Sequence, residues 1–240
     1  MRLIWIWLGI FKNKILIKRL ELLTSNLIHQ RGFYSSVLEL PATLDDDSLH
    51  IQAGKTDLIF KEQKDFDGAY HFCFNIPENK FAECKAWTSA KIPLLKDDKG
   101  NDEFTGGSWN SSSIYFKDSA GNILEFIARH DQKNATDESF NSKHILQVSE
   151  IGLPSQDVIS FAKDLCSTLG MDVYRQDINE TFTPIGDEDG LLILPVENRI
   201  WYPNTGVPAK LLDVKVDLEV NGKNFQITGM PYQVQSLTSA

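Results

Sequence analysis

A single carboxylate stands in an otherwise apolar run near the middle of the chain. In "KDSAGNILEFIARH", residues 117–130, turn-forming Asp, Ser, Gly and Asn precede the strand formers of "ILEFIA". Side chains alternate between the two faces of a strand, so Glu125 shares an apolar face with an isoleucine on either side. A buried carboxylate without partners costs free energy. Glu125 is therefore expected to pair with a cation such as Arg19 or Arg129, to bind a metal ion, or to face a wet cavity.

The other residue types that nucleophilic and metal sites need are sparse. Cys73, Cys84 and Cys166 show neither Cys-x-x-Cys nor Cys/His spacing, so no disulfide framework and no structural zinc site is expected. A reducing, cytoplasmic setting fits this cysteine usage best. His71 shares a strand face with Cys73 and is either a neutral core histidine or a ligand. The sequence places no base beside Cys73, so a nucleophilic role is not expected.

Length and charge exclude some classes of protein. The chain has 240 residues, of which 42% are hydrophobic, enough for one large domain or two ordinary ones. Its formal net charge of −9 does not attract phosphate backbones, and no basic cluster with interleaved aromatic residues stands out. Nucleic acid is therefore not expected as a partner.

The first residues form an apolar run, "LIWIWLGIF", at positions 3–11. This run is much shorter than the ~20 residues that span a bilayer, and no small-residue cleavage site follows it before "KNK". No transmembrane span is expected. We treat residues 1–16 as an N-terminal extension with three open interpretations: an additional strand, a segment docked on the surface, or upstream sequence included by an early start codon.

The order strand, helix and further strands recurs along the chain and predicts tandem βαβββ units. The expected elements are, in order, a strand at 17–27, a helix at 28–40, a hairpin at 48–62 about Gly54, a strand at 69–77, a helix at 78–90, strands at 111–118 and 122–129, a strand at 145–154, a helix at 155–170, and strands at 171–176, 180–187 and 190–195. A later strand pair surrounds Asn221-Gly222, a dipeptide suited to a type I′ turn. No helix follows that pair, so a fourth unit is missing or degenerate.

One βαβββ unit cannot bury its sheet face alone, whereas two can curl their strands around a shared cavity. We therefore predict an α+β fold with one domain of two units at 17–130, which would hold the cavity. The polar stretch 131–144 is the expected linker to a second, partial domain at 145–240. The Gly-rich segment 100–110 has the character of a loop that borders a ligand site.

These units resemble the vicinal-oxygen-chelate superfamily, which includes glyoxalase I, extradiol dioxygenases, and the fosfomycin- and bleomycin-resistance proteins. The resemblance rests on "RLELLTSNLIHQRGFYSSVLELP", "AYHFCFNIP", "SSIYFKDSAGNILEFIAR" and "SEIGLPSQDVISFAKDLCSTLGMDV". It implies a cupped, mainly antiparallel sheet that encloses a small-molecule site. In this superfamily a divalent metal is held by His, Gln or Glu from the first strand of each unit and from a last strand.

The resemblance places the ligand positions on Arg19, His71 and Glu125. Imidazole and carboxylate suit Mn, Fe, Ni or Zn, whereas a guanidinium cannot coordinate a metal. Glu21, two residues along the same face, is the candidate replacement for Arg19 or a substrate contact. The alternative is that Arg19 and Glu125 form an ion pair in the cup and no metal binds. Glu150 occupies the corresponding position of the third unit, where the sequence identifies no partner ligands.

Two functions follow from the resemblance. The first is a metal-dependent lyase, isomerase or transferase in which Glu125 doubles as a base. Ring-opening dioxygenase chemistry needs two His and one carboxylate, so it is disfavoured. The second is a metal-free protein of the bleomycin-resistance type, whose acidic cup sequesters a cationic ligand against Trp87, Trp109 and Tyr115. The architecture also allows a homodimer in which two chains exchange units.

Overall fold

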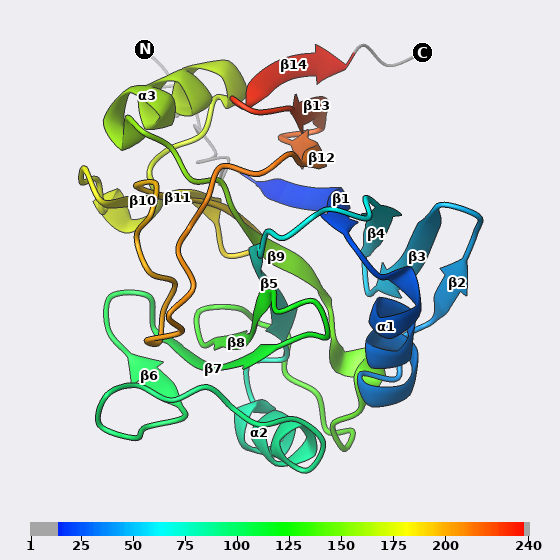
Figure 1. Cartoon of the computed structure of the whole chain (residues 1–240). Coiled ribbons are helices and arrows are strands. Elements are labelled where there is room, and N and C mark those ends of the chain that lie inside the picture. Colours follow the sequence, from blue (N-terminus) through cyan, green and yellow to red (C-terminus); the bar gives the residue numbers. More distant parts are fainter. Residues whose placement is uncertain (1–13, 238–240) are drawn as a thin grey trace, which may run out of the picture.

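The computed structural model describes residues 14–237, which form two seven-stranded sheets and three α-helices (Figure 1). Sheet A has the strand order β14 (Gln233–Leu237), β13 (Lys223–Thr228), β12 (Lys215–Val220), β1 (Ile15–Thr24), β4 (Thr56–Glu62), β3 (Ser48–Ala53) and β2 (Ala42–Leu44). Sheet B has the order β10 (Phe182–Asp187), β11 (Gly190–Pro195), β9 (Gln147–Gly152), β5 (His71–Ile76), β8 (Ile123–Arg129), β7 (Ser111–Lys117) and β6 (Phe104–Gly106).

The three α-helices lie where the sequence predicted helices. They are α1 (Leu27–Gly32), continued by a π-helical turn (Phe33–Val37), α2 (Phe81–Ser89) and α3 (Val158–Leu169). Two 3₁₀ turns that were not predicted lie at Ser142–His144 and Tyr174–Gln176. The Asp157 side chain caps α3 by accepting from the Ser160 backbone N–H at 3.0 Å. The helix ends at Gly170, whose φ of 65° is a left-handed conformation that glycine adopts without strain. Among the described helices, none is long and apolar enough to cross a membrane.

Most predicted strands are also present. The hairpin turn between β12 and β13 has positive φ at Asn221 (51°) and Gly222 (77°), as a type I′ turn requires. The predicted strand at 171–176 is wrong: one isolated bridge, Val173 to Ile185, precedes the 3₁₀ turn there. The fourth unit is degenerate, since β12, β13 and β14 are consecutive antiparallel strands with no helix among them. The predicted extension 1–16 falls mostly outside the described residues, and β1 already begins at Ile15.

Strand pairing differs from the predicted grouping of units. β5 of the second unit pairs with β9 of the third, and β1 of the first pairs with β12. Both sheets therefore contain strands from both sides of 131–144, and the prediction of one cup within 17–130 is wrong. A sequence pattern identifies a strand and its buried face, but either backbone edge of that strand can accept a partner. The predicted domain boundaries remain a prediction.

One continuous apolar cluster packs between the sheets and under the helices, and it includes Phe72 and Phe74 of β5 and Leu124 and Phe126 of β8. Alternation then turns the intervening residues of β5 and β8 to the opposite face of sheet B. The 196–214 segment, orange in Figure 1, joins β11 to β12 and runs beside β6 and β7 on that opposite face.

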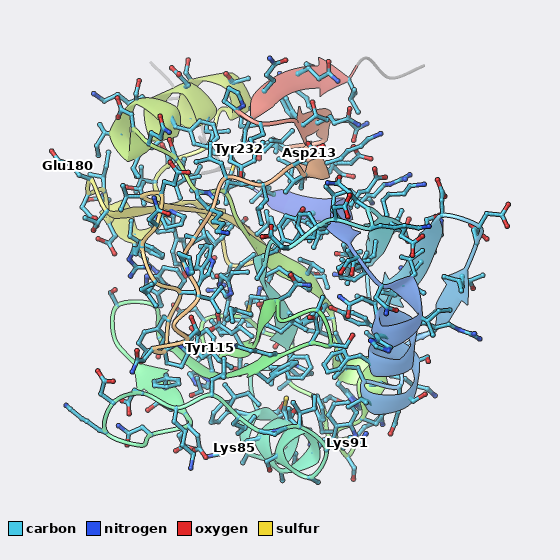
Figure 2. All side chains as sticks on the ribbon, viewed as in Figure 1. Lys85, Lys91, Tyr115, Glu180, Asp213 and Tyr232 are labelled. Atoms are coloured by element: carbon cyan, nitrogen blue, oxygen red, sulfur yellow. The ribbon has the colours of Figure 1, made fainter. Side chains whose placement is uncertain are left out.

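The loop that leads into β6 is fixed to α2. The ammonium of Lys85 contacts Asp102 at 2.6 Å and Glu103 at 2.8 Å. Figure 2 shows Lys85 at the outer side of α2, whereas Tyr115 of β7 lies inside the molecule. These contacts position β6 and the loop after it as one wall of the cavity described next.

Candidate metal and small-molecule site

A row of functional side chains crosses four strands of sheet B. The register pairs Tyr115 of β7 with Glu125 of β8, Glu125 with Cys73 of β5, and Cys73 with Glu150 of β9. Register partners on neighbouring strands point to the same face, and His71 joins them because it lies two residues before Cys73. One ligand atom each from His71, Glu125 and Glu150 lies within 4.8 Å of the others.

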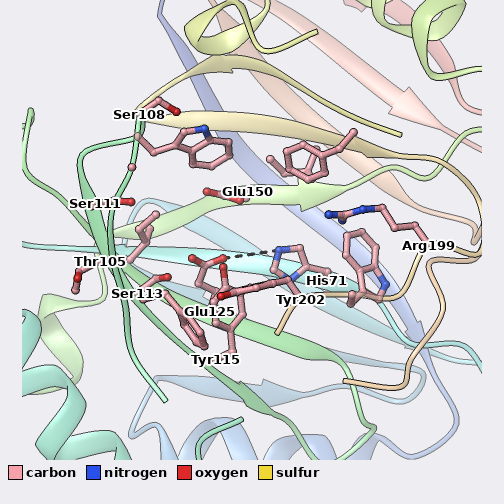
Figure 3. Close-up of a pocket in the computed structure, with 18 residues that line it drawn as sticks. His71, Thr105, Ser108, Ser111, Ser113, Tyr115, Glu125, Glu150, Arg199 and Tyr202 are labelled. Atoms are coloured by element: carbon pink, nitrogen blue, oxygen red, sulfur yellow. Dashed lines mark ion pairs between the residues drawn. The ribbon is translucent and has the colours of Figure 1, made fainter. Parts of the chain in front are cut away.

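The orientation of the His71 ring is fixed by its backbone neighbour. Its Nδ1 lies 3.0 Å from the carbonyl oxygen of Ile123. A carbonyl only accepts, so Nδ1 carries the proton and the lone pair of the neutral ring is on Nε2. That nitrogen lies 3.8 Å from Oε2 of Glu125 (Figure 3). A ligand histidine commonly donates its other nitrogen in this way.

The turn between β7 and β8 holds this arrangement together. The buried carboxylate of Asp118 accepts from the backbone N–H groups of Ala120 (2.9 Å) and Asn122 (3.0 Å), which closes the turn. It also accepts from the side chains of Gln30 (2.8 Å), Tyr34 (3.1 Å) and Asn122 (2.7 Å). The Asn122 amide oxygen in turn accepts from Tyr70 N–H at 2.8 Å. The "DSAGN" turn thus links α1, the start of β8 and the residue before His71.

Glu150 is held by a buried arginine. The Arg129 guanidinium, 1% exposed, contacts Oε1 of Glu150, and its Nε donates to the Asn75 amide oxygen at 3.1 Å. A carboxylate has two oxygens that accept, so the second oxygen of Glu150 can serve a ligand. Arg129 is thus the cation that pairs with the cluster, and it contacts Glu150 and not Glu125.

Burial sets the protonation of the cluster. It raises the pKa of the Glu125 carboxyl to about 8, and the charge of Glu150 adds to the increase. It lowers the pKa of His71 to about 4, with a smaller contribution from the charge of Arg199. Burial also raises the pKa of Glu150, which the contact with Arg129 opposes. Near pH 7 the metal-free cluster therefore holds a neutral imidazole, a protonated Glu125 and an ion-paired Glu150.

The cluster forms the floor of a cavity of about 380 Å³. Six aromatic side chains line it: Phe104, Trp109, Tyr115, Phe182, Trp201 and Tyr202. The volume and the apolar walls with a few polar groups are typical of a site for one small molecule. Trp201 packs beside the His71 ring, with centroids 4.9 Å apart. Gly152 makes room for it, since a Cβ at that position would lie 2.5 Å from Trp201 Cη2.

The structure brings together four of the predicted site residues and excludes three, of which Trp87 lies on α2 against Phe140. His71, Trp109, Tyr115 and Glu125 all line the cavity. Arg19 and Glu21 lie in sheet A, where Arg19 Nη2 contacts Glu21 Oε2 at 3.0 Å. The predicted alternative of an Arg19–Glu125 ion pair is therefore wrong, because β1 and β8 belong to different sheets. Neither Arg19 nor Glu21 contributes to this cavity.

The sequence analysis did not assign three features of this site. The partner ligands of Glu150 were not identified, because they come from the second unit, which was expected to pair with the first. Arg129 was considered only as a partner of Glu125. Arg199 and Trp201 lie in "NRIWYP" on the 196–214 segment, where a basic residue among aromatics was the available signal.

The three donors fit a divalent metal ion. Atoms no more than 4.8 Å apart lie within about 2.8 Å of a common point, whereas bonds to nitrogen and oxygen ligands are about 2.0–2.2 Å. Small side-chain rotations close that difference. One imidazole with a free Nε2 lone pair and two carboxylates suit Mn²⁺, Fe²⁺, Ni²⁺ or Zn²⁺. A buried His/Glu/Glu cluster that can bind a metal is therefore present.

Neither a scan against protein-family models nor a search of curated protein sequences finds a significant match. Solved structures do match. A "putative dioxygenase" from Bacillus subtilis has a TM-score of 0.56 and 15% identity, covering 75% of this chain and 63% of that protein. Glyoxalase I from Zea mays has a TM-score of 0.53 and 12% identity, covering 87% and 75%. A mutant of the maize enzyme gives 0.54 and 13%, covering 88% and 76%.

These matches give the chain the fold of the vicinal-oxygen-chelate superfamily, as its sequence predicted. Identities of 12–15% concern the fold alone. This chain also spans less than two thirds of the length of the Bacillus subtilis protein. Any activity therefore has to be inferred from the side chains of the cavity.

Proposed function

We propose that this protein is a metal-dependent enzyme of the glyoxalase/dioxygenase-like class that acts on one small molecule in the sheet B cavity. The observation that carries the proposal is the His71, Glu125 and Glu150 cluster at the floor of an aromatic cavity. The superfamily fold supports it, because glyoxalase I has that fold. Lyase, isomerase or transferase chemistry is the reaction class that we propose to test first.

His71 and the two glutamates would hold the ion, and a bound divalent ion would supply Lewis acidity to substrate oxygens. The chain's own residues would do the rest. The Ile123 carbonyl keeps Nε2 of His71 free, and the contact with Arg129 favours the ionised form of Glu150. The pKa of about 8 applies to Glu125 without a metal; a bound divalent ion would lower it, so Glu125 would hold the ion as a carboxylate and could accept a proton from a substrate. Trp201, which packs beside the His71 ring, would limit the access of water to the floor of the cavity.

The donor set argues against ring-opening dioxygenase chemistry, which commonly uses two histidines and one carboxylate. The cluster in this protein has one histidine and two carboxylates. Sequestration of a cationic ligand is also not favoured. Of the charged groups that line the cavity within the described residues, Glu150 is ion-paired and Glu125 holds a proton near pH 7, while Arg199 is a cation.

The test is metal binding by the full chain. We expect one Mn²⁺, Fe²⁺, Ni²⁺ or Zn²⁺ per protein, measured by mass spectrometry of dialysed samples and by calorimetric titration. His71→Ala and Glu125→Gln should each weaken binding at least tenfold. Glu21→Gln is the matched control, since this carboxylate lies in sheet A beside Arg19 and should leave binding unchanged.

Two results would reject the proposal. One is the absence of stoichiometric binding for all four metals. The other is equal binding by wild type, His71→Ala and Glu125→Gln, which would place any bound metal elsewhere. If binding is confirmed, the loaded protein should be screened with small vicinal-oxygen substrates for lyase, isomerase and transferase activity.

A further inference from the structure

One charged group in the cavity has no role in holding the metal cluster. Arg199 lies on the 196–214 segment and lines the cavity with a partly buried side chain. Figure 3 shows its guanidinium pointing toward the interior, on the side of His71 opposite Glu125. Its charge is close enough to contribute to the lowered pKa of the His71 ring.

Arg199 differs from the other arginines near this site. Arg129 contacts Glu150, and Arg175 contacts Asp131 and Glu188. Within residues 14–237, Arg199 has no ion pair and no side-chain hydrogen bond, and its one ring contact is with Phe182, 4.9 Å from the ring centroid. Burial lowers the pKa of Arg199, and no neighbouring carboxylate offsets that effect. A guanidinium in a partly dry cavity is stabilised when an anion supplies the missing partner.

The position of Arg199 is fixed by its own segment. The Arg199 carbonyl accepts from Ala209 N–H at 2.8 Å, and the Trp201 N–H donates to Val207 at 2.9 Å. The segment therefore folds back on itself and presents Arg199 and Trp201 to the same cavity. An arginine held on an ordered backbone loses less conformational entropy when it binds an anion.

We propose that Arg199 binds a carboxylate of the substrate, so that the substrate is a small organic acid with a flat apolar body. One guanidinium balances one carboxylate, whereas a phosphate dianion would leave charge uncompensated in the cavity. Phe182, over which the Arg199 guanidinium lies, and Trp201 line the same cavity, and such rings suit an aromatic or conjugated body. The opposite end of such a molecule would reach His71 and Glu125.

This inference rests on the proposed small-molecule function of the cavity and names its substrate class. It differs from the expectation, based on the net charge of −9, that the cup would attract cations. The global charge belongs mainly to the surface, whereas the cavity presents a guanidinium without a protein partner. The ligand charge is therefore decided by one residue.

The experiment uses metal-free full-length protein in EDTA, so that a bound metal cannot hold the carboxylate. Benzoate and phenylacetate are compared with their uncharged amides, benzamide and phenylacetamide, by saturation-transfer NMR titration. We expect each acid to bind at least tenfold more tightly than its amide. Arg199→Gln should weaken the acids about tenfold to a hundredfold and leave the amides unchanged, as expected for a lost charge-assisted hydrogen bond.

Two further variants sharpen the test. Arg199→Lys keeps the charge but loses the planar fork, so it should bind the acids with intermediate affinity. Arg31→Gln removes an exposed arginine of α1, far from the cavity, and should match wild type. Far-UV circular dichroism and thermal melting would verify that each variant is folded. If Arg199→Gln does not fold, Arg199→Lys is compared with wild type in its place.

Equal binding of the acids to wild type and Arg199→Gln would overturn the inference. Equal binding of acids and amides to wild type would also overturn it. So would the absence of binding of either acid at ligand concentrations on the order of tens of millimolar. The Mn²⁺ titration of Arg199→Gln separates this outcome from the proposed function. Retained Mn²⁺ binding by Arg199→Gln with lost acid binding supports both proposals, whereas a wild-type protein that binds the acids but none of the four metals rejects only the metal site.

Discussion

Replacing Glu125 with glutamine should stabilise the metal-free protein at alkaline pH, although it should also abolish metal binding. Burial raises the pKa of Glu125 from 4.5 to about 8 and lowers that of His71 from 6.5 to about 4. Between pH 4.5 and 6.5 the folded state binds one proton more at Glu125 and one fewer at His71 than the unfolded state. The two contributions to the pH dependence of stability therefore cancel there.

Between pH 6.5 and 8, only Glu125 of these two residues contributes to the pH dependence of stability. The unfolded state is then ionised at this carboxyl while the folded state is protonated, so stability falls as pH rises. The interval is 1.5 pH units, and each unit corresponds to about 1.36 kcal/mol, which gives a loss of about 2 kcal/mol. Glu125→Gln should show no such loss. Below pH 6.5 it should instead lose about 3 kcal/mol by pH 4.5, because the His71 contribution is no longer cancelled.

The assay is urea unfolding followed by tryptophan fluorescence in EDTA, at intervals from pH 4.5 to 8.5. The measured quantity is the difference in the free energy of unfolding between wild type and Glu125→Gln, which removes titrations common to both. Glu21→Gln in sheet A is the matched control and should run parallel to wild type. Parallel curves for wild type and Glu125→Gln between pH 6.5 and 8 would refute the assignment of a raised pKa to Glu125.

Three further predictions concern residues that support the site. Asp118→Ala should lower the free energy of unfolding by about 3 kcal/mol, because several donors around it lose a buried acceptor; a loss below about 1 kcal/mol in urea unfolding would contradict this role. Gly152→Ala should cost about 1–3 kcal/mol and change the fluorescence of Trp201, since the new Cβ would lie 2.5 Å from its ring. Unchanged stability and emission would mean that the ring moves freely. Arg129→Met should cost about 3–5 kcal/mol at pH 8 by leaving Glu150 buried without its cation. Adding Glu150→Gln should restore most of that loss, and a double variant as unstable as the single one would disprove the pairing.

Local patterns in the sequence were sufficient to predict the α-helices, the longer strands and the faces of those strands, but not the short strands β2, β6 and β14. The alternation in "ILEFIA" predicts that Glu125 and Phe126 point to opposite faces of the strand. In the structure Phe126 is in the apolar cluster, whereas Glu125 lines the cavity. The turn residues 118–122 form the predicted turn, and Gly170 ends the predicted helix. Such features depend on residues only a few positions apart, so their physical causes are contained in short segments.

The candidate site was predicted only in part. His71, Trp109, Tyr115 and Glu125 belong to the second unit, and the geometry within one unit follows from its own periodicity. Arg19 and Glu21 were included because the first unit was expected to pair with the second. The fold offers two equivalent-looking partners for each unit, and the sequence contains nothing local that distinguishes them.

The amino-acid sequence by itself therefore determined the α-helices, most of the strands with their buried faces, and the superfamily fold. Only the tertiary structure decided that β5 pairs with β9, which brings Glu150 and its partner Arg129 to His71 and Glu125. It also decided that the 196–214 segment returns over the cavity with Arg199. The physical reason is that strand pairing depends on backbone hydrogen bonds, which are the same for every sequence. The choice among partner strands depends on packing of the whole core. That packing brings together residues far apart in the sequence, such as His71 and Glu150, which are more than 70 positions apart.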